Sequence, residues 1–155
     1  MSQSAKKHGS GCPVAFALDT FGDRWSLLVI RDLMLRGNET YGEFLESGEG
    51  IATNVLADRL KGLEAEGIID KSPDPDNRRR NIYRLTDKGL DLAPVVMEMI
   101  RWAGKYDSSR EARKGNVRLI ENDSDGFLAS LRSRLTGDIQ YGIEGNPQAS
   151  QIVRL

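Results

Sequence analysis

Two chemically versatile residues are scarce in this chain of 155 residues, which contains one cysteine, Cys12, and one histidine, His8. A single cysteine cannot form a disulfide within the chain, so any disulfide would join Cys12 to another molecule. Cys12 with His8 as its base is the best candidate for a catalytic pair, but His8 lies in a polar leader rich in Gly and Ser that does not fix its geometry. No cluster of metal ligands and no glycine-rich phosphate loop is present either. The sequence therefore predicts no enzyme, no metal site and no cofactor.

Long apolar runs are also missing. Runs such as Leu27-Leu28-Val29-Ile30 fall far short of the roughly 18 residues that a membrane span needs. The leader 1–11 is polar, and no apolar stretch follows it that could serve as a signal peptide. We therefore expect a cytoplasmic protein with no membrane contact and with a flexible N-terminal leader over residues 1–11.

The chain has almost no net charge, because its 22 basic and 23 acidic residues give −1. Nucleic-acid-binding proteins are often basic overall, so this total argues mildly against that class. The distribution is uneven, however. Residues 71–84 contain five basic and two acidic residues, whereas residues 39–50 contain four glutamates and no basic residue. A basic segment thus lies on a nearly neutral chain.

The apolar pattern predicts helices in the first part of the chain. Pro13 can open a first helix that runs to Gly22. Asp23 is the expected cap of a second helix, Arg24 to Arg36, which is apolar over much of its circumference and stops at Gly37. We expect this second helix to lie in the core.

Two further helices are predicted around a short turn. Thr40-Tyr41-Gly42-Glu43 has the pattern of a capping box, which begins a short helix reaching about Ser47. After the turn Gly48-Glu49-Gly50, a helix from about Thr53 to Glu66 ends at Gly67. One face of it carries three leucines: Leu56, Leu60 and Leu63.

The periodicity then changes to that of strands. Ile68 to Lys71 and Asn81 to Leu85 are predicted to pair as a hairpin, with a Pro- and Asp-rich turn that carries Arg78, Arg79 and Arg80. Thr86 or Asp87 caps a long helix to about Tyr106, which we expect to be kinked at Pro94.

The polar stretch from Asp107 to Gly115 is the predicted boundary of the main domain. We expect a domain over residues 12–106 and a C-terminal extension of unknown role over 107–155. In the extension, one helix is predicted from Gly126 to Leu135, and a hairpin is predicted from residues 138–143 and 151–155.

A short capped helix, a turn, an amphipathic helix and a hairpin, in this order, form a winged helix-turn-helix. The predicted fold class is therefore mainly α with a small β-hairpin, with an additional C-terminal segment. The second helix of such a unit presents its polar face to base edges in the major groove. The DNA-binding candidates on the two helices and the hairpin tip are Thr40, Tyr41, Thr53, Asn54, Ala57, Asp58, Lys61, Arg78, Arg79 and Arg80.

Each of these features has a simpler interpretation. A polar helix face is usually just solvated, and three arginines at a hairpin tip can simply increase solubility. Asp74 and Asp76 cannot bind all three arginines, however, and guanidinium groups suit phosphates and narrow minor grooves. A recognition helix beside a basic hairpin favours DNA contact over a winged helix that only binds other proteins.

Several motifs resemble those of the HxlR-type winged-helix regulators. They are Cys12-Pro13-Val14, Gly22-Asp23-Arg24-Trp25, Leu56-Ala57-Asp58-Arg59-Leu60, Leu63-Glu64, Gly67-Ile68-Ile69 and Tyr83-Arg84-Leu85-Thr86-Asp87-Lys88-Gly89. Their order and spacing extend the resemblance from about Cys12 to Trp102. It implies a dimeric transcription factor without enzymatic activity. The chain departs from the family where Ala52-Thr53-Asn54 replaces Ser-Pro-Lys, so its base preferences should differ.

The resemblance also implies dimerisation through the first helix and the last helix of the domain. Both helices carry an apolar stripe that one small domain cannot bury. The candidate dimerisation residues are Val14, Leu18, Val95, Met99, Trp102 and Tyr106.

Cys12 lies at the start of the first helix, where the family has a cysteine that senses oxidants or electrophiles in some members. We regard it as a redox candidate, with a buried structural cysteine as the alternative. The sequence leaves open whether a small-molecule effector binds as well.

Overall fold

The computed structural model describes residues 11–108 and 114–137. Within these ranges the chain is mainly helical, with one two-stranded antiparallel hairpin, as the sequence predicted. The elements are α1 (Pro13–Phe21), α2 (Arg24–Arg31), the π-helix η1 (Asp32–Arg36), α3 (Tyr41–Leu45), α4 (Thr53–Ala65), β1 (Ile69–Pro73), β2 (Asn81–Leu85), α5 (Asp87–Leu90), α6 (Ala93–Tyr106), α7 (Lys114–Asn122) and α8 (Ser124–Thr136). Residues 1–10 of the predicted leader and the predicted hairpin after residue 137 lie outside the described residues.

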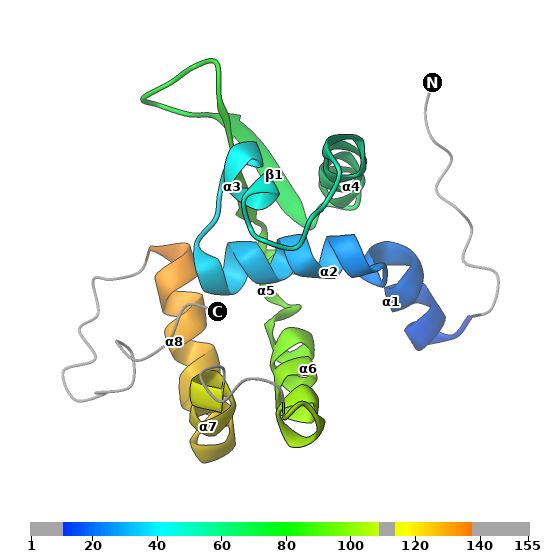
Figure 1. Ribbon diagram of the computed structural model, residues 1–155, viewed down its shortest axis with the longest axis vertical. Coiled ribbons are helices and arrows are strands. Elements are labelled where there is room, and N and C mark those ends of the chain that lie inside the picture. The colour runs from blue at the N-terminus through cyan, green and yellow to red at the C-terminus, as the bar shows by residue number, and fades with distance from the viewer. Residues whose placement is uncertain (1–10, 109–113, 138–155) are drawn as a thin grey trace.

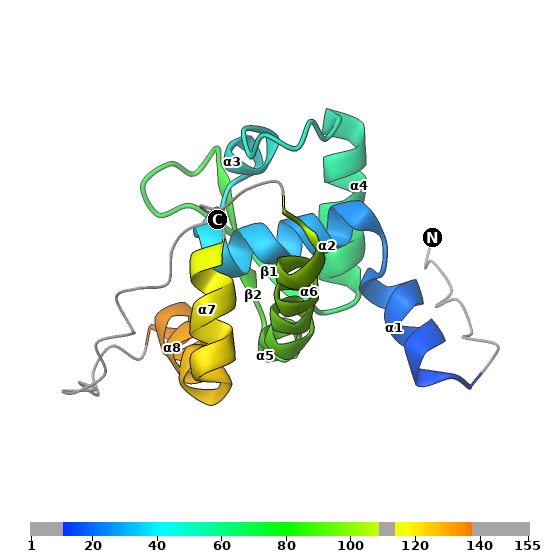
Figure 2. The same ribbon diagram turned by 60° about the horizontal axis from the view of Figure 1, so that its bottom comes forward.

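Helix α2 forms the middle of the molecule. Figures 1 and 2 show α3 and α4 on one side of it and α6, α7 and α8 on the other, with α1 projecting from its N-terminal end. The tip of the hairpin extends on the side of α3 and α4 (Figure 1). The helix-turn-helix and the hairpin therefore share one side of the molecule.

The core is built on both sides of α2 and η1. The leucines predicted to share one face of α4 are buried, and they meet apolar residues of α2, the hairpin and α6 in a single cluster. Burial of this contiguous apolar surface is the main force that holds α4 against α2. Among the described residues, the largest fully buried apolar side chains are Phe44, Ile30, Met34, Leu35, Leu56, Leu63, Ile68, Ile69, Ile120 and Leu131.

The second predicted helix begins and ends where expected but changes its winding. Asp23 is its N-cap, because the Asp23 carboxylate accepts hydrogen bonds of 3.0 Å from the backbone N–H groups of Trp25 and Ser26. The helix reaches Arg36 as predicted, but its last turn, Asp32–Arg36, is wound as a π-helix. Gly37, at a φ of 71°, ends it. Such π-helical turns are rare and occur mostly as single turns inside α-helices, frequently at functional sites.

The hairpin is joined to the helix-turn-helix by more than the chain connection. Its strands pair in register from Ile69 opposite Leu85 to Pro73 opposite Asn81. The N–H of Tyr83 in β2 also donates to the carbonyl of Glu39, just before α3, over 2.7 Å. These bonds fix the hairpin beside α3.

The expectation of one long helix kinked at Pro94 is wrong. Thr86 caps a short helix, α5, that ends at Leu90, and a new helix begins at Ala93. Proline lacks an N–H and its ring collides with the carbonyl four residues earlier, so Pro94 lies in the first turn of α6 and not inside a helix. Gly89 is buried where α5 approaches β1, and a Cβ atom there would collide with the carbonyl oxygen of Ile68.

The C-terminal extension contains two described helices where the sequence predicted one. Helix α8 corresponds to the predicted helix, and α7 begins inside the stretch that was expected to be a polar boundary. Ile120, Phe127 and Leu131 of these helices belong to the same buried cluster as α2 and α4. The division of the chain near residue 107 stays a prediction. None of the described helices is long and apolar enough to span a membrane.

Candidate nucleic-acid interface

Helix α4 presents the polar face that the sequence predicted. Its three leucines are buried, whereas all five candidate side chains on the other face are exposed. These side chains are Thr53, Asn54, Ala57, Asp58 and Lys61. The N-cap, Ala52, has no side-chain oxygen to accept from the first backbone N–H groups of the helix. Those donors and the positive end of the helix dipole suit a phosphate group.

The two candidates at the start of α3 have different environments. Thr40 is buried, and its hydroxyl accepts from the N–H of Glu43, whose carboxylate accepts in return from the N–H of Thr40. Thr40 therefore serves mainly to begin α3. The hydroxyl of half-buried Tyr41 donates to the carbonyl of Thr53 over 2.7 Å. This bond ties the first turn of α3 to the first turn of α4.

Asp58, one of the DNA-binding candidates on α4, is partly neutralised by its neighbour. Arg59 lies 3.0 Å from the Asp58 carboxylate and also 3.0 Å from the Asp23 carboxylate. Burial opposes ionisation of Asp23, but hydrogen bonds from Ser26, together with the charge of Arg59, lower its pKa overall. Arg59 thus links α4 to the junction of α1 and α2. This role could not be predicted from the sequence, because the spacing of Arg59 on α4 does not reveal a contact with the distant Asp23.

The three arginines of the hairpin tip are not equivalent. Arg80 donates through Nε to the buried carboxylate of Asp74 over 2.6 Å, and its Nη2 also pairs with that carboxylate. The backbone N–H of Asp76 and the side chain of Arg80 together lower the pKa of Asp74. Arg78 and Arg79 are exposed, and within the described part of the chain no partner is seen for the guanidinium group of either. Arg80 therefore shapes the loop, while Arg78 and Arg79 remain available to a ligand.

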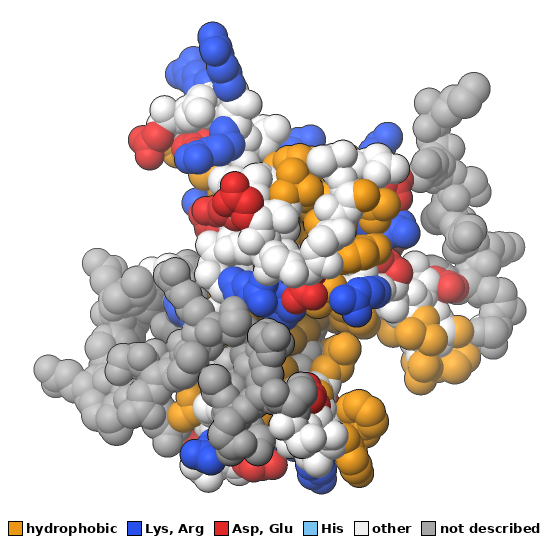
Figure 3. Space-filling view, in the orientation of Figure 1, with side chains coloured by type: hydrophobic (Ala, Val, Ile, Leu, Met, Phe, Trp, Pro, Cys, Tyr) orange, Lys and Arg blue, Asp and Glu red, His pale blue; other side chains and the backbone are white. Residues whose placement is uncertain are grey.

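Two apolar helix faces lie away from this interface. Figure 3 shows apolar side chains gathered on α1 and on α6 at the lower right of the view. All six candidate dimerisation residues are among the exposed large apolar side chains, with Trp102 67% and Tyr106 70% exposed. Phe16 of α1 is exposed as well and was not predicted, because the sequence argument followed only the Val14 and Leu18 stripe. Counting every apolar residue of this short helix as a candidate, whatever its spacing, would have included Phe16.

Cys12 is exposed and stands at the N-cap of α1. It does not pack as a small core residue of this chain, which was the structural alternative. Among the described residues, no three His, Cys, Asp or Glu side chains gather in a way that would hold a metal ion.

The sequence of residues 20–111 matches the family described as HxlR-like helix-turn-helix. This match covers more than half of the chain. The chain belongs to this family. HxlR-like proteins are helix-turn-helix transcriptional regulators and not enzymes. DNA binding is implied by this membership.

Two curated relatives come from Bacillus subtilis (strain 168). The chain is 36% identical over 90 residues to the uncharacterized HTH-type transcriptional regulator YvaP, and this match covers 58% of the chain and 82% of the relative. It is also 36% identical over 96 residues to the HTH-type transcriptional regulator YodB, and this match covers 61% of the chain and 85% of the relative.

Solved structures agree on the fold. PA1607, described as a transcription factor, is 36% identical with a TM-score of 0.61, and the match covers 69% of this chain and 73% of the other. The redox regulator HypR in its oxidised form is 30% identical with a TM-score of 0.56, over 63% of this chain and 99% of the other. Helices α7 and α8 of this HxlR-like chain lie entirely beyond the family match, which ends at residue 111.

Proposed function

We propose that this chain is a sequence-specific DNA-binding regulator that binds an inverted-repeat operator as a homodimer. One observation carries the proposal: α4 and the tip of the hairpin, which contains Arg78 and Arg79, lie on the same side of α2 (Figure 1), while exposed apolar side chains of α1 and α6 gather elsewhere (Figure 3). A DNA surface and a dimer surface can therefore be used at the same time.

Base recognition is assigned to α4. Asn54 can form two hydrogen bonds with adenine, Lys61 can donate to guanine or phosphate, and Thr53 and Ala57 can contact a thymine methyl group. The backbone N–H groups at the start of α4, which no side chain caps, would suit a phosphate near the same turn. These residues are expected to set which sequence is preferred.

Affinity without sequence preference is assigned to the wing, defined here as the hairpin loop of residues 74–80. Arg78 and Arg79 would contact phosphates or a narrow minor groove, since neither is neutralised by a described partner. Arg80 is expected to act indirectly, because its pairing with Asp74 holds the loop that presents them.

The homodimer is assigned to α1 and α6. Burial of apolar side chains such as Trp102 against a second copy would remove them from water. The two copies of α4 are then expected to face DNA half-sites that lie one turn, roughly 10 base pairs, or a multiple of that apart. An inverted repeat is the operator that fits two-fold symmetry.

The proposal is tested by a salt titration of binding to a duplex of random sequence. Arg78→Gln and Arg79→Gln, singly and together, should lower the affinity and flatten the dependence on salt, by about one unit of slope for each arginine that contacts phosphate. Arg118→Gln is the matched control, because Arg118 is an exposed arginine on α7, at the other end of the molecule from the wing (Figure 1). An unchanged slope in the double variant contradicts the wing assignment.

The same titration separates the alternative function. A winged helix that binds only other proteins would give no steep salt dependence with DNA, even in the unaltered chain.

We also propose that Cys12 makes the regulator responsive to oxidation. Two observations favour it: Cys12 is exposed at the start of α1, beside the surface assigned to the dimer, and the similar protein HypR is described as a redox regulator in oxidised and reduced forms. A hydroperoxide would oxidise one Cys12 thiol to a sulfenic acid and leave as an alcohol or water. A second thiol, from the partner or from a small molecule, would then form a disulfide and release water.

The redox proposal is tested by measuring DNA affinity before and after treatment with a hydroperoxide. The change should be reversed by a dithiol reductant and should be absent in Cys12→Ser. An equal response in the serine variant would place the oxidation at another group, such as a methionine.

A further inference from the structure

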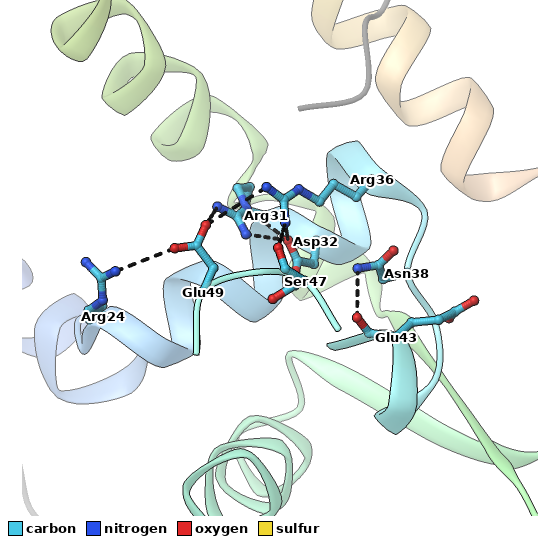
Figure 4. Close-up of polar contacts among 8 residues, drawn as sticks. All are labelled: Arg24, Arg31, Asp32, Arg36, Asn38, Glu43, Ser47 and Glu49. Atoms are coloured by element: carbon cyan, nitrogen blue, oxygen red, sulfur yellow. Dashed lines mark hydrogen bonds and ion pairs between the residues drawn. The ribbon is translucent and has the colours of Figure 1, made fainter. Parts of the chain in front are cut away.

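A cluster of charged side chains lies between the core helix and the helix-turn-helix turn, and Figure 4 draws it. Arg31 of α2 donates through Nη1 to Oε1 of Glu49 over 2.8 Å, and through Nε and Nη2 to Oδ1 of Asp32 over 2.9 and 2.6 Å. One guanidinium group therefore joins a carboxylate of the core to a carboxylate of the turn.

Arg36 and Arg24 complete this cluster from two directions. Arg36 of η1 donates through Nη1 to the carbonyl of Ser47 over 2.8 Å, and its Nη2 lies 3.9 Å from Glu49. Arg24, at the start of α2, lies 3.6 Å from the other oxygen of Glu49. Three arginines of the α2–η1 segment thus converge on the four-residue turn that begins at Ser47.

Burial makes these contacts costly to lose. The Asp32 side chain is 3% exposed, and those of Arg31 and Arg36 are 15% and 16% exposed. Burial raises the pKa of Asp32 despite its arginine neighbours, whereas the hydrogen bond from Arg31 lowers the pKa of Glu49. A buried charge needs an opposite charge nearby to offset the loss of hydration. Removal of one partner would therefore leave an uncompensated buried charge and destabilise this geometry of the cluster.

The turn itself has little local rigidity. Gly48 and Gly50, on either side of Glu49, adopt φ values of 85° and 75°, which favour glycine and leave a flexible backbone around the glutamate. Ala52, two residues after Gly50, begins α4 without a side-chain cap. The position of the first turn of α4, with Thr53 and Asn54, therefore depends on contacts outside the turn.

We propose that Glu49, held by Arg31 and Arg36, is a positioning residue that fixes the start of α4 relative to α2 and so sets the sequence preference of the regulator. This inference rests on the proposed DNA-binding function. Glu49 does not contact DNA in this arrangement; it acts through the placement of Thr53 and Asn54. Tyr41, bonded to the carbonyl of Thr53, holds the same turn from the α3 side.

The test compares two probes of equal length and composition: a labelled duplex enriched by the unaltered protein from a randomised pool, and a scrambled duplex. Glu49→Gln keeps the shape of the side chain but removes the charge that pairs with the arginines. It should reduce the preference for the selected duplex about tenfold, the effect of misplacing one good base contact, while affinity for the scrambled duplex changes by less than about twofold.

Glu46→Gln is the matched control. Glu46 is an exposed glutamate at the end of α3, next to the same turn, and within the described residues no side-chain partner is seen for it. It should change affinity for both duplexes to the same extent, because it removes only a negative charge near the DNA. Arg31→Lys is a milder second variant, since an ammonium group keeps the charge but cannot bind Asp32 and Glu49 in the same forked way.

Hydrogen exchange in the free protein gives a readout that does not need DNA. Backbone amides of residues 47–54 should exchange faster in Glu49→Gln, while those of the hairpin strands stay protected. An equal fall in affinity for both duplexes, or an unchanged preference in both Glu49→Gln and Arg31→Lys, overturns the proposal. If Glu49→Gln does not fold, Arg31→Lys decides by the same criteria. If the unaltered protein binds no duplex with a salt-dependent affinity, the proposed function fails, and this inference with it.

Discussion

Helix α1 and the α2–η1 segment are neighbours in the chain, and both contain many apolar residues, yet their surroundings differ completely. No residue of α1 is buried, whereas every residue of η1 except Arg36 is buried. The rest of the described chain covers α2 and η1 from two sides but leaves Val14, Phe16 and Leu18 of α1 exposed to water (Figures 1 and 3). Apolar composition alone therefore does not identify the core. It identifies surfaces that need a partner, which lies in the same chain for α2 and, by our proposal, in a second copy for α1.

The largest expected effect separates the two segments directly. Ile30→Ala in α2 should lower the free energy of unfolding by about 2–5 kcal/mol, because Ile30 is fully buried and the substitution leaves a cavity. Leu18→Ala in α1 removes a similar side chain that is 60% exposed, so the isolated protomer should lose no more than about 0.5 kcal/mol. Urea unfolding at low protein concentration measures both. Equal losses would mean that α1 is part of the core.

A second effect concerns α6, which carries exposed large apolar side chains as α1 does. Trp102→Ala should weaken the dimer by about 2 kcal/mol, or roughly thirtyfold in dissociation constant, because large aromatic side chains dominate such interfaces. Lys105→Ala, an exposed polar residue of the same helix, is the control and should change little. Sedimentation equilibrium measures the dissociation constants. A protein that is monomeric at micromolar concentration before any substitution would refute the dimer.

The smallest effect lies at the junction of the two segments, where Asp23 caps α2. Asp23→Ala should cost about 1 kcal/mol, the usual value of an N-cap, and Asp23→Asn should retain most of the cap. The pKa of Asp23 is lowered in the folded chain, so the ionised carboxylate contributes stability above the ordinary pKa of an aspartate and loses it as the pH falls through the folded-state value. The stability difference between the unaltered protein and Asp23→Asn should therefore be present near neutral pH and disappear in acid. If the stability difference between the two proteins is independent of pH, the ionised form of Asp23 does not stabilise the fold through Arg59 and the cap.

Much of the fold follows from short-range patterns. The Asp23 cap, the Thr40 and Glu43 capping box and the leucine stripe of α4 each involve residues within about one or two helical turns of one another, so spacing reveals them. The exposed face of α4 is then the face without leucines. The hairpin is equally local, because its strands are joined by one short turn.

The features that could not be predicted involve distant parts of the chain. Arg31 and Glu49 are 18 residues apart, and Arg134 of α8 donates to the carbonyl of Met34 in η1 across 100 residues. No local pattern distinguishes Arg80, which pairs with Asp74, from Arg78 and Arg79. The π-helical winding of Asp32–Arg36 and the separation of α5 from α6 likewise depend on what packs against them.

The amino-acid order thus specified the caps, the turns and the amphipathic faces, because hydrogen bonds and side-chain contacts between near neighbours are set by spacing along the chain. Packing specified which apolar faces became core, which arginines stayed exposed and how the turn before α4 is held. These outcomes depend on competition among many possible long-range contacts, in which burial from water and charge pairing act together.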